Sequence, residues 1–342
     1  MERDYPKLAD IRRKEQFKID LTLDELNEGY RSSIVLVGSK GTGKTTMLNN
    51  IPLRKKGYKY IKINSSLISN PNQFTDVVCS SLKYYPPKME DWKLYADTVF
   101  NYIHTSDSKY VFLIDDVHYL AQMKKDILAY VRNKYQELNN IIFIMTLDKE
   151  YIGDILAYDK PFYGQLHSIE LDSISKQECH TLIESMSSIK SPELNDFIYQ
   201  YSDGIPMYIK LFIECFSFIL MNDLPTIKYR INEVCNIKDE NINEFYKDVF
   251  VNYKYQYISE LKDRLDAVIG SQLSPQLKAI LRLMVKYTDI SNAEISRKLY
   301  TSSGAVSTQM KRLADKGLVR KDRGGYTVKQ YVKLLFDDEN SY

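Results

Sequence analysis

One eight-residue segment constrains the fold of this 342-residue chain more than any other feature of the sequence. It satisfies the pattern G-x-x-x-x-G-K-S/T of a phosphate-binding loop and reads Gly38-Ser39-Lys40-Gly41-Thr42-Gly43-Lys44-Thr45. Such a loop joins a buried strand to a helix, because the helix N-terminus must face the phosphates. The apolar, β-branched run 33–37 before the loop and residues 45–49 after it fit that context. We therefore expect a strand, a loop and a helix in this order.

The residues of this loop have distinct expected roles in binding ATP and Mg²⁺. The glycines let backbone amides turn toward phosphate oxygens, and the positive end of the following helix faces the same anion. Lys44 is expected to reach the β- and γ-phosphates, and the hydroxyl of Thr45 is expected to ligate magnesium. The predicted loop contacts are Gly38, Ser39, Lys40, Gly41, Thr42, Gly43, Lys44, Thr45 and Thr46. The alternative is a glycine-rich loop without a function.

Two adjacent carboxylates follow an apolar run at 111–114 and predict the metal side of the site. Magnesium bound to nucleotide needs a carboxylate at the end of a neighbouring strand, and Asp115 has that place. We assign Asp116 to polarising the attacking water, the alternative being a solvated strand-end carboxylate. Thr146 ends the next apolar run and is expected to sense the γ-phosphate or the water, unless it is an ordinary strand-terminal threonine. The predicted catalytic set is Lys44, Asp115, Asp116 and Thr146.

Strand-like and helix-like segments alternate over residues 1–170. After the strand at 33–37, further strands are expected at 58–63, 110–114 and 141–146. The intervening helical patterns lie at 74–82, 92–103 and 123–138, and a helix is expected near the start of the chain, ending close to Gly29. Alternation of this kind predicts an α/β domain with a parallel sheet covered on both faces.

The rest of the chain has helical periodicity and predicts two further domains. Residues 171–270 are interpreted as a helical lid and connector, with helices expected at 176–186, 192–201 and 207–221. Residues 271–342 are interpreted as a winged helix-turn-helix. Its three helices are expected at 275–287, 291–299 and 302–316, before a hairpin with a Gly-Gly turn.

Charge and cysteine content narrow the class of protein. The net charge is only +2, but residues 271–342 contain 13 Lys and Arg against 7 Asp and Glu, so the basic excess lies at the C-terminal end. The four cysteines form no CxxC pair and no zinc-ligand spacing, which argues against a disulfide framework or a metal knuckle. No signal peptide or membrane segment is evident, and we expect a cytoplasmic protein.

The predicted winged helix supplies a candidate surface for duplex DNA. The third helix of such a domain enters the major groove, and the hairpin contacts backbone phosphates. The predicted DNA contacts on the helix and the hairpin are Ser302, Ser303, Ser307, Thr308, Gln309, Lys311, Arg312, Arg320, Lys321 and Arg323. In the alternative interpretation, the same domain packs on the ATPase core as an internal latch.

Four features in order resemble the archaeal ATPases of the STAND and AAA-related branch of P-loop proteins. They are the P-loop, the strand ending in two aspartates, the segment 159–165 and the segment 204–208. The resemblance, together with the terminal winged helix, covers most of the chain. It implies an AAA-like α/β P-loop NTPase core, followed by a helical lid and a winged helix-turn-helix.

The resemblance also carries individual residues over. Segment 159–165 matches the family's Pro-Leu-Tyr-Gly-Arg at Pro161, Tyr163 and Gly164, but Gln165 stands where the family has arginine. An amide cannot offset charge developing on the γ-phosphate, so slow or partner-dependent hydrolysis is implied. Pro206 resembles the proline of the family's GxP motif, which packs near the nucleotide base; a simple turn is its alternative. Residues 13–15 faintly resemble an Arg-x-x-Glu box.

Two functional hypotheses follow. In the first, the chain is an ATPase whose nucleotide state controls assembly on, or binding to, duplex DNA. In the second, it is a STAND-type switch that binds ATP or ADP, turns over slowly and signals through a homo-oligomer or a protein partner, with no role in DNA binding. Helicase translocation is a weaker third hypothesis, because the sequence has no additional helicase motifs.

Overall fold

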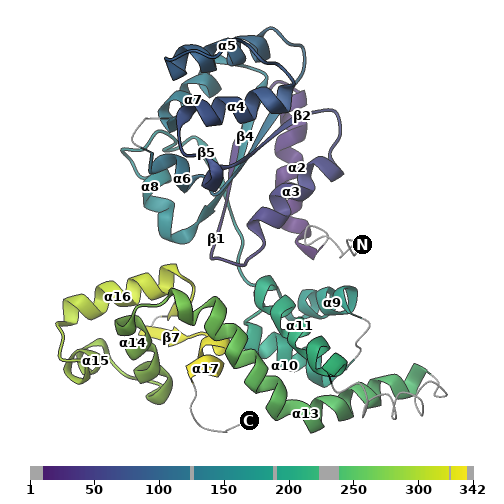
Figure 1. Ribbon diagram of the computed structural model, residues 1–342, viewed down its shortest axis with the longest axis vertical. Coiled ribbons are helices and arrows are strands. Elements are labelled where there is room, and N and C mark those ends of the chain that lie inside the picture. Colours follow the sequence, from purple (N-terminus) through teal and green to yellow (C-terminus); the bar gives the residue numbers. More distant parts are fainter. Residues whose placement is uncertain (1–10, 124–126, 188–190, 223–238, 323–324, 337–342) are drawn as a thin grey trace. The chain divides into compact units, whose positions relative to one another are not determined.

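The computed structural model describes residues 11–123, 127–187, 191–222, 239–322 and 325–336 (Figure 1). The chain divides between Asp172 and Ser173 into two compact units. We call Lys7–Asp172 the N-terminal unit and Ser173–Tyr342 the C-terminal unit. The P-loop belongs to the first, and the predicted lid and winged helix both belong to the second.

The N-terminal unit contains a five-stranded parallel sheet with the strand order β2-β3-β4-β1-β5. The strands are β1 (Ser33–Gly38), β2 (Lys59–Asn64), β3 (Tyr110–Asp115), β4 (Ile141–Asp148) and β5 (Leu166–Glu170). Strands β1, β3 and β4 are almost wholly buried, as their continuous apolar sequences predict. The predicted parallel α/β fold is therefore confirmed.

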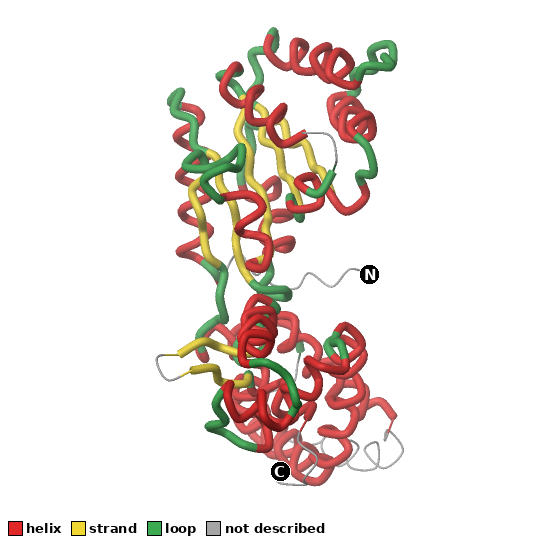
Figure 2. Tube along the Cα trace, turned by 90° about the vertical axis from the view of Figure 1, so that its left-hand side faces the viewer, coloured by secondary structure: helices red, strands yellow, loops and turns green. Residues whose placement is uncertain are grey.

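Helices cover both faces of this sheet (Figure 2). They are α2 (Arg13–Asn27), α3 (Lys44–Arg54), α4 (Pro71–Leu82), α5 (Trp92–His104), α6 (His118–Ala121), α7 (Ile127–Glu137) and α8 (Ile152–Leu156), with short 3₁₀ turns at Ser65–Leu67 and Lys149–Tyr151. Side chains alternate between the faces along β1. Ile34 packs with Leu23 and Met47 from α2 and α3, whereas Val35 packs in the cluster that contains Phe74 and Phe100 from α4 and α5.

The fifth strand is absent from the sequence prediction. Strand β5 lies at the edge of the sheet, next to β1, and has the sequence Leu-His-Ser-Ile-Glu. Only Ile169 of its five residues is buried, so it has neither a continuous apolar run nor a clear alternation. Its pairing with β1 is what identifies it as a strand.

The C-terminal unit begins with helices packed around an aromatic cluster. They are α9 (Lys176–Met186), α10 (Pro192–Ser202), α11 (Pro206–Asn222) and α13 (Asp239–Val268). Phe197, Phe212, Phe216, Phe250 and Tyr257 make edge or tilted ring contacts in their core. Among the residues that the structure describes, no helix combines the length and the apolar character needed to cross a bilayer.

The remainder of the C-terminal unit is a winged helix-turn-helix, as predicted. It comprises α14 (Pro275–Lys286), α15 (Asn292–Lys298), α16 (Ser303–Asp315), the antiparallel strands β6 (Val319–Asp322) and β7 (Gly325–Val328), and a final helix α17 (Gln330–Phe336). Ser274, Ser291 and Ser302 cap the three helices, which explains why each starts where it does. Helix α17 contacts α10, α13 and α14, so the lid helices and the winged helix share one unit. The proposed division at residue 270 stays a prediction.

Candidate nucleotide site and DNA-binding surface

The phosphate-binding loop connects β1 to α3 and has the backbone shape that its glycines allow. Gly41 and Gly43 have φ angles of 85° and 94°, in the left-handed region. Gly43 is the N-cap of α3, and because glycine has no side chain, it does not cap the amides of the first turn. A Cβ at Gly38 would lie 2.5 Å from the carbonyl oxygen of Leu171 and from the hydroxyl of Thr42. The loop therefore has the close packing and the open helix N-terminus that a phosphate cradle requires.

Lys44 lies inside this loop, and its side chain is only 6% exposed. Its Nζ donates to the carbonyl oxygens of Gly38 at 2.9 Å and Ser39 at 3.0 Å. The same Nζ lies 2.6 Å from Oδ1 of Asp148, the last residue of β4. A phosphate oxygen is a stronger partner for an ammonium group than a carbonyl oxygen, so this position suits phosphate binding.

Hydrogen bonds join α3, β3 and β4 at the carboxyl ends of the strands. The hydroxyls of Thr45 and Thr146 both donate to Oδ1 of Asp115, at 3.0 and 2.5 Å. The Thr146 hydroxyl in turn accepts the backbone N–H of Asp116 at 2.7 Å. The structure thus brings together residues from three segments that lie far apart in the sequence, because adjacent parallel strands end at one edge of the sheet.

Asp116 has an unusual backbone and an unusual charge environment. Its φ is 53°, in the left-handed region that non-glycine residues rarely adopt. Burial, with the neighbouring carboxylates of Asp115 and Asp148, raises the pKa of the Asp116 carboxyl. A raised pKa makes a carboxylate a better proton acceptor at neutral pH, as the role of general base requires.

These side chains fit a nucleoside triphosphate with magnesium. The loop offers amides and one ammonium group for phosphate oxygens, and Thr45 and Asp115 offer neighbouring oxygen ligands. Magnesium prefers such hard oxygen donors and usually takes only one or two from the protein. Lys40 and Thr46 are exposed positions of the same loop and helix, and their expected contacts with nucleotide stay predictions.

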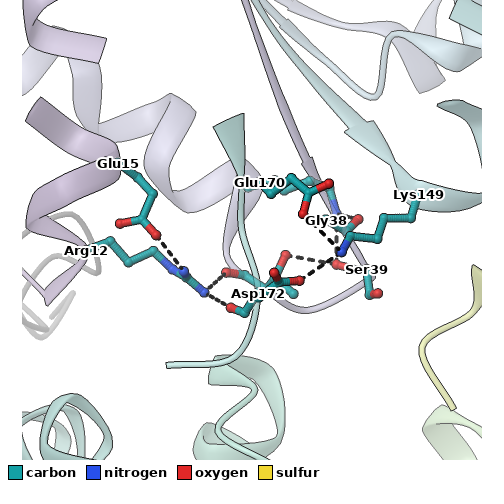
Figure 3. Close-up of polar contacts among 9 residues, drawn as sticks. Arg12, Glu15, Gly38, Ser39, Lys149, Glu170 and Asp172 are labelled. Atoms are coloured by element: carbon teal, nitrogen blue, oxygen red, sulfur yellow. Dashed lines mark hydrogen bonds and ion pairs between the residues drawn. The ribbon is translucent and has the colours of Figure 1, made fainter. Parts of the chain in front are cut away.

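Three residues next to the loop were missed by the sequence analysis, and Figure 3 shows two of them, Arg12 and Lys149. The Arg12 guanidinium donates to the carbonyl oxygens of Thr42, at 3.2 Å, and Asp172, and it pairs with Glu15 at 3.5 Å. The arginine at Arg-x-x-Glu spacing is therefore Arg12, and not Arg13, the first residue of the segment 13–15. The spacing of three residues to Glu15 was the available signal.

Asp148 and Lys149 are the other two residues next to the loop that the sequence analysis missed. Asp148 pairs with the loop lysine, while the next residue, Lys149, pairs with Asp172 at 2.8 Å and lies 3.8 Å from Glu170 (Figure 3). Consecutive residues therefore contact the P-loop and the end of the N-terminal unit. Only the position of Asp148, two residues beyond Thr146, pointed to this edge of the sheet.

His118 is a buried titratable group at the same edge. Its ring stacks on Tyr151, with 4.0 Å between the ring centroids, and burial lowers the pKa of the imidazole. Among the described residues, Nδ1 has no hydrogen-bond partner. In the sequence, only the position of His118, two residues after Asp116, could have indicated that it lies near this site.

Replacing Arg12 with alanine is expected to loosen the P-loop. The change removes buried charge-assisted hydrogen bonds to two carbonyl groups, a loss of about 1–3 kcal/mol in the free energy of unfolding. We expect Arg12→Lys to recover little, because Nη2 of Arg12 donates to both carbonyl oxygens while Nη1 contacts Glu15, and an ammonium group has only one nitrogen. Thermal unfolding measures this loss of stability. The control is Lys14→Ala, which changes an exposed residue of α2. Equal melting temperatures for wild type and Arg12→Ala would contradict the assignment.

Replacing Asp148 with asparagine is expected to strengthen ATP binding by about five-fold, because phosphate must displace this carboxylate from Lys44. Titration of a fluorescent ATP analogue measures the change. Asp172→Asn is the matched control, since the Asp172 side chain pairs with Lys149. Weaker binding by Asp148→Asn would show that the carboxylate supports nucleotide binding and does not compete with it.

Gln165 is the position at which this sequence departs from the family that it resembles. Its side chain contacts an arginine from another element. With its amide oxygen assigned toward α7, it accepts from Nη2 and Nε of Arg132, both at 3.0 Å. A guanidinium therefore lies beside this position, although the residue itself carries no charge.

Pro206 lies in the C-terminal unit, at the first position of α11. It follows the turn residues Asp203 and Gly204, whose φ angles of 52° and 67° reverse the chain after α10. The predicted contact between Pro206 and the nucleotide base stays a prediction.

The predicted DNA surface consists largely of exposed side chains. Helix α16 exposes Ser303, Ser307, Thr308, Lys311 and Arg312, its N-cap Ser302 is exposed as well, and β6 exposes Arg320 and Lys321. Gln309 differs: it is half-buried and its amide donates to Gln276 of α14 at 3.2 Å, so contact with a base requires this bond to open. Arg320 pairs with Asp322 at 3.0 Å. Arg323 lies outside the described residues.

Comparison with family models agrees with this architecture. Residues 27–150 match the model described as AAA domain, and residues 273–320 match the model described as winged helix-turn-helix DNA-binding. The chain thus combines an AAA-type P-loop NTPase domain with a C-terminal winged helix-turn-helix. No curated protein matches the chain.

Solved structures share the fold over nearly the whole chain. A Walker-type ATPase of Pyrococcus abyssi has 15% identity and a TM-score of 0.60, with 95% of each chain covered. Cdc6p from Pyrobaculum aerophilum has 12% identity and a TM-score of 0.53, covering 98% of this chain and 96% of that one. A RuvB variant from Thermotoga maritima has 14% identity and a TM-score of 0.51, with 95% of each chain covered. At these identities, the likeness shows the fold alone.

Proposed function

We propose that this chain is a magnesium-dependent ATPase whose nucleotide state controls its assembly on, or binding to, duplex DNA through the winged helix. The observation that carries the proposal is the convergence of Lys44, Thr45, Asp115 and Thr146 at one edge of an AAA-type sheet. The basic, exposed face of α16 in the same chain adds the DNA partner.

Each side chain at the nucleotide site has a defined task in this proposal. Lys44 exchanges its carbonyl and carboxylate partners for β- and γ-phosphate oxygens. Thr45 and Asp115 would hold magnesium, which would neutralise charge on the phosphates when bound. Asp116 takes a proton from the attacking water. Thr146 fixes the geometry, since it bonds both the Asp115 carboxylate and the Asp116 amide.

A slow or partner-dependent turnover fits the arrangement around Gln165. Its neutral amide stands where the archaeal family that the chain resembles has arginine, and the neighbouring guanidinium of Arg132 is engaged in two hydrogen bonds with this amide. A charge held in that way is less available to stabilise a developing negative charge. A second subunit or a protein partner would then supply the missing cation.

A second candidate function is a STAND-type switch in which the winged helix is a latch. Contacts of helix α17 with the turn before α11 and with α11 itself favour it. The carboxylate of Asp203 accepts the backbone N–H of Gln330 at 2.6 Å, and the rings of Tyr208 and Tyr331 stack with 4.0 Å between their centroids. The winged helix is therefore tied to the GxP turn. A movement of Pro206 would be transmitted to the winged helix through these contacts.

Gel-shift measurements separate the two candidates. The full chain is incubated with a duplex at physiological salt, with ATP, with ADP and without nucleotide. A DNA-associated ATPase shows binding that depends on nucleotide and disappears when residues 271–342 are deleted. Absence of binding, or binding unaffected by the deletion, contradicts the DNA proposal.

Light scattering with each nucleotide tests the alternative. A switch that signals through a homo-oligomer or a protein partner changes its assembly state with nucleotide in the absence of DNA. The same mass with ATP and with ADP, in a protein that binds both, excludes homo-oligomeric switching.

A further inference from the structure

The turn between α15 and α16 contains a tyrosine in an unfavourable backbone conformation. Tyr300 has a φ of 51°, in the left-handed region, and its side chain is 98% exposed. It lies two residues after the end of α15 and three residues before the first residue of α16. The turn thus presents a whole phenol ring to the solvent next to the N-terminus of the predicted recognition helix.

Packing within the chain does not account for this residue. A bulky side chain in the left-handed region costs conformational free energy that glycine does not. Tyrosine usually recovers such a cost by burying its ring, but this ring removes almost no apolar surface from water. The stability of the fold therefore favours glycine at position 300, and the phenol ring points to a contact outside the chain.

The charges around the turn indicate what that contact is. Residues 295–314 include Arg297, Lys298, Lys311 and Arg312 and no acidic residue. The first two form the last turn of α15, and both are exposed. A surface that combines exposed cations with a phenol hydroxyl suits the sugar-phosphate backbone of a nucleic acid.

Helix-turn-helix geometry places this turn at the edge of a groove. The second helix inserts its N-terminal end toward the bases, while the first helix crosses the backbone. The segment that joins them must then lie beside the phosphates that border the groove. Residues of such a turn are therefore expected to contact the backbone and not the base edges.

We propose that Tyr300 is a DNA-backbone contact whose hydroxyl donates to a phosphate oxygen, beside the charges of Arg297 and Lys298. This inference rests on the proposed binding of duplex DNA and extends the interface beyond α16 and the hairpin to the turn before α16. Because a phosphate contact carries no sequence information, Tyr300 contributes equally on different duplexes.

Fluorescence anisotropy of the full chain with two labelled duplexes of unrelated sequence tests the contact. Tyr300→Phe keeps the ring and the backbone conformation and removes only the hydroxyl. We expect its dissociation constant to rise about ten-fold on both duplexes, since a hydrogen bond to a charged group is lost. Tyr255→Phe, on another exposed tyrosine of the C-terminal unit, is the matched control and leaves the affinity unchanged. Wild-type affinity in Tyr300→Phe overturns the proposal.

A second variant separates binding from folding. Tyr300→Gly relieves the backbone strain, so we expect an equal or higher melting temperature together with DNA affinity at least ten-fold weaker. A structural role predicts the opposite pairing, in which lower stability accompanies any loss of affinity. A fall in melting temperature that matches the fall in affinity therefore overturns the proposal.

Salt dependence identifies the kind of contact. Lys298→Ala removes a charge that neutralises one phosphate, so the slope of log Kd against log salt falls by about one. Tyr300→Phe removes no charge and leaves the slope unchanged. A changed slope in Tyr300→Phe contradicts a simple hydroxyl contact.

Lys311→Ala distinguishes failure of this inference from failure of the proposed function. If the wild type binds duplex and Lys311→Ala weakens binding but both Tyr300 variants do not, only the turn contact is wrong. If the wild type binds no duplex, both proposals fail. Loss of affinity that appears with single strands but not with duplexes also overturns the inference, because the groove-edge geometry belongs to a double helix.

Discussion

Lys44→Ala is expected to abolish measurable binding of ATP, with at least about a 100-fold rise in the dissociation constant. The reason is the position of the Lys44 ammonium inside the loop, where it is within 3.0 Å of two loop carbonyl oxygens. Alanine removes the only positive side chain that the described loop buries. Titration with a fluorescent ATP analogue in the presence of magnesium measures the loss.

The control for this change is Lys56→Ala, which removes an exposed ammonium group after α3. It should leave the affinity as in the wild type, and its melting temperature should also be unchanged. Retention of ATP binding by Lys44→Ala would mean that the loop amides alone hold the phosphates, or that the nucleotide binds elsewhere.

Asp116→Asn is expected to spare ATP binding and to lower kcat about 100- to 1,000-fold, the contribution typical of a general base. The amide is nearly isosteric with the carboxylate but cannot take a proton from water. Steady-state hydrolysis by the wild type and by Asp116→Asn gives the change in kcat. The dissociation constant of each protein for ATP shows whether binding has changed as well. Comparable turnover in wild type and Asp116→Asn removes the base assignment.

The pH dependence of turnover gives an independent check on Asp116. Burial and the carboxylates of Asp115 and Asp148 raise its pKa, so the carboxyl takes up a proton at a higher pH than an ordinary aspartate. Only the deprotonated form acts as a base, and activity should therefore fall as the pH drops through this raised pKa. Asp116→Glu, which keeps a carboxylate, should retain an acidic limb of this kind, whereas Asp116→Asn should lose it.

Much of the candidate nucleotide site was predictable because its residues are tied to strand ends. The glycine pattern of the loop, the apolar run before Asp115 and the apolar run before Thr146 each predict a buried parallel strand. Once three such strands are parallel neighbours, their carboxyl ends must meet at one edge. The proximity of Thr45, Asp115 and Thr146 follows from these patterns.

The residues that were missed have contacts that local patterns do not encode. Arg12 reaches the carbonyl oxygens of Thr42 and Asp172, which lie 30 and 160 residues away along the chain. Strand β5 is recognisable through its pairing with β1, since its own sequence is mostly polar and exposed. Both features depend on tertiary packing that a single sequence does not display.

The C-terminal unit shows the same division between local and tertiary signals. Helical periodicity and the Gly-Gly hairpin signal predicted the three helices and the wing, and the structure confirms them. Helix α17 was not predicted, and its contacts with Asp203 and Tyr208 tie the winged helix-turn-helix to the turn before α11 and to α11 itself. The left-handed conformation of Tyr300 was equally invisible, because nothing in the residue type favours it.

Calorimetric titration of ATP into the full chain tests the central claim most directly. With magnesium present, the account predicts uptake of one ATP per chain, weakened when the metal is chelated and lost in Lys44→Ala. Absence of binding heat for ATP and ADP at several temperatures, with folded protein and magnesium in excess, would contradict it.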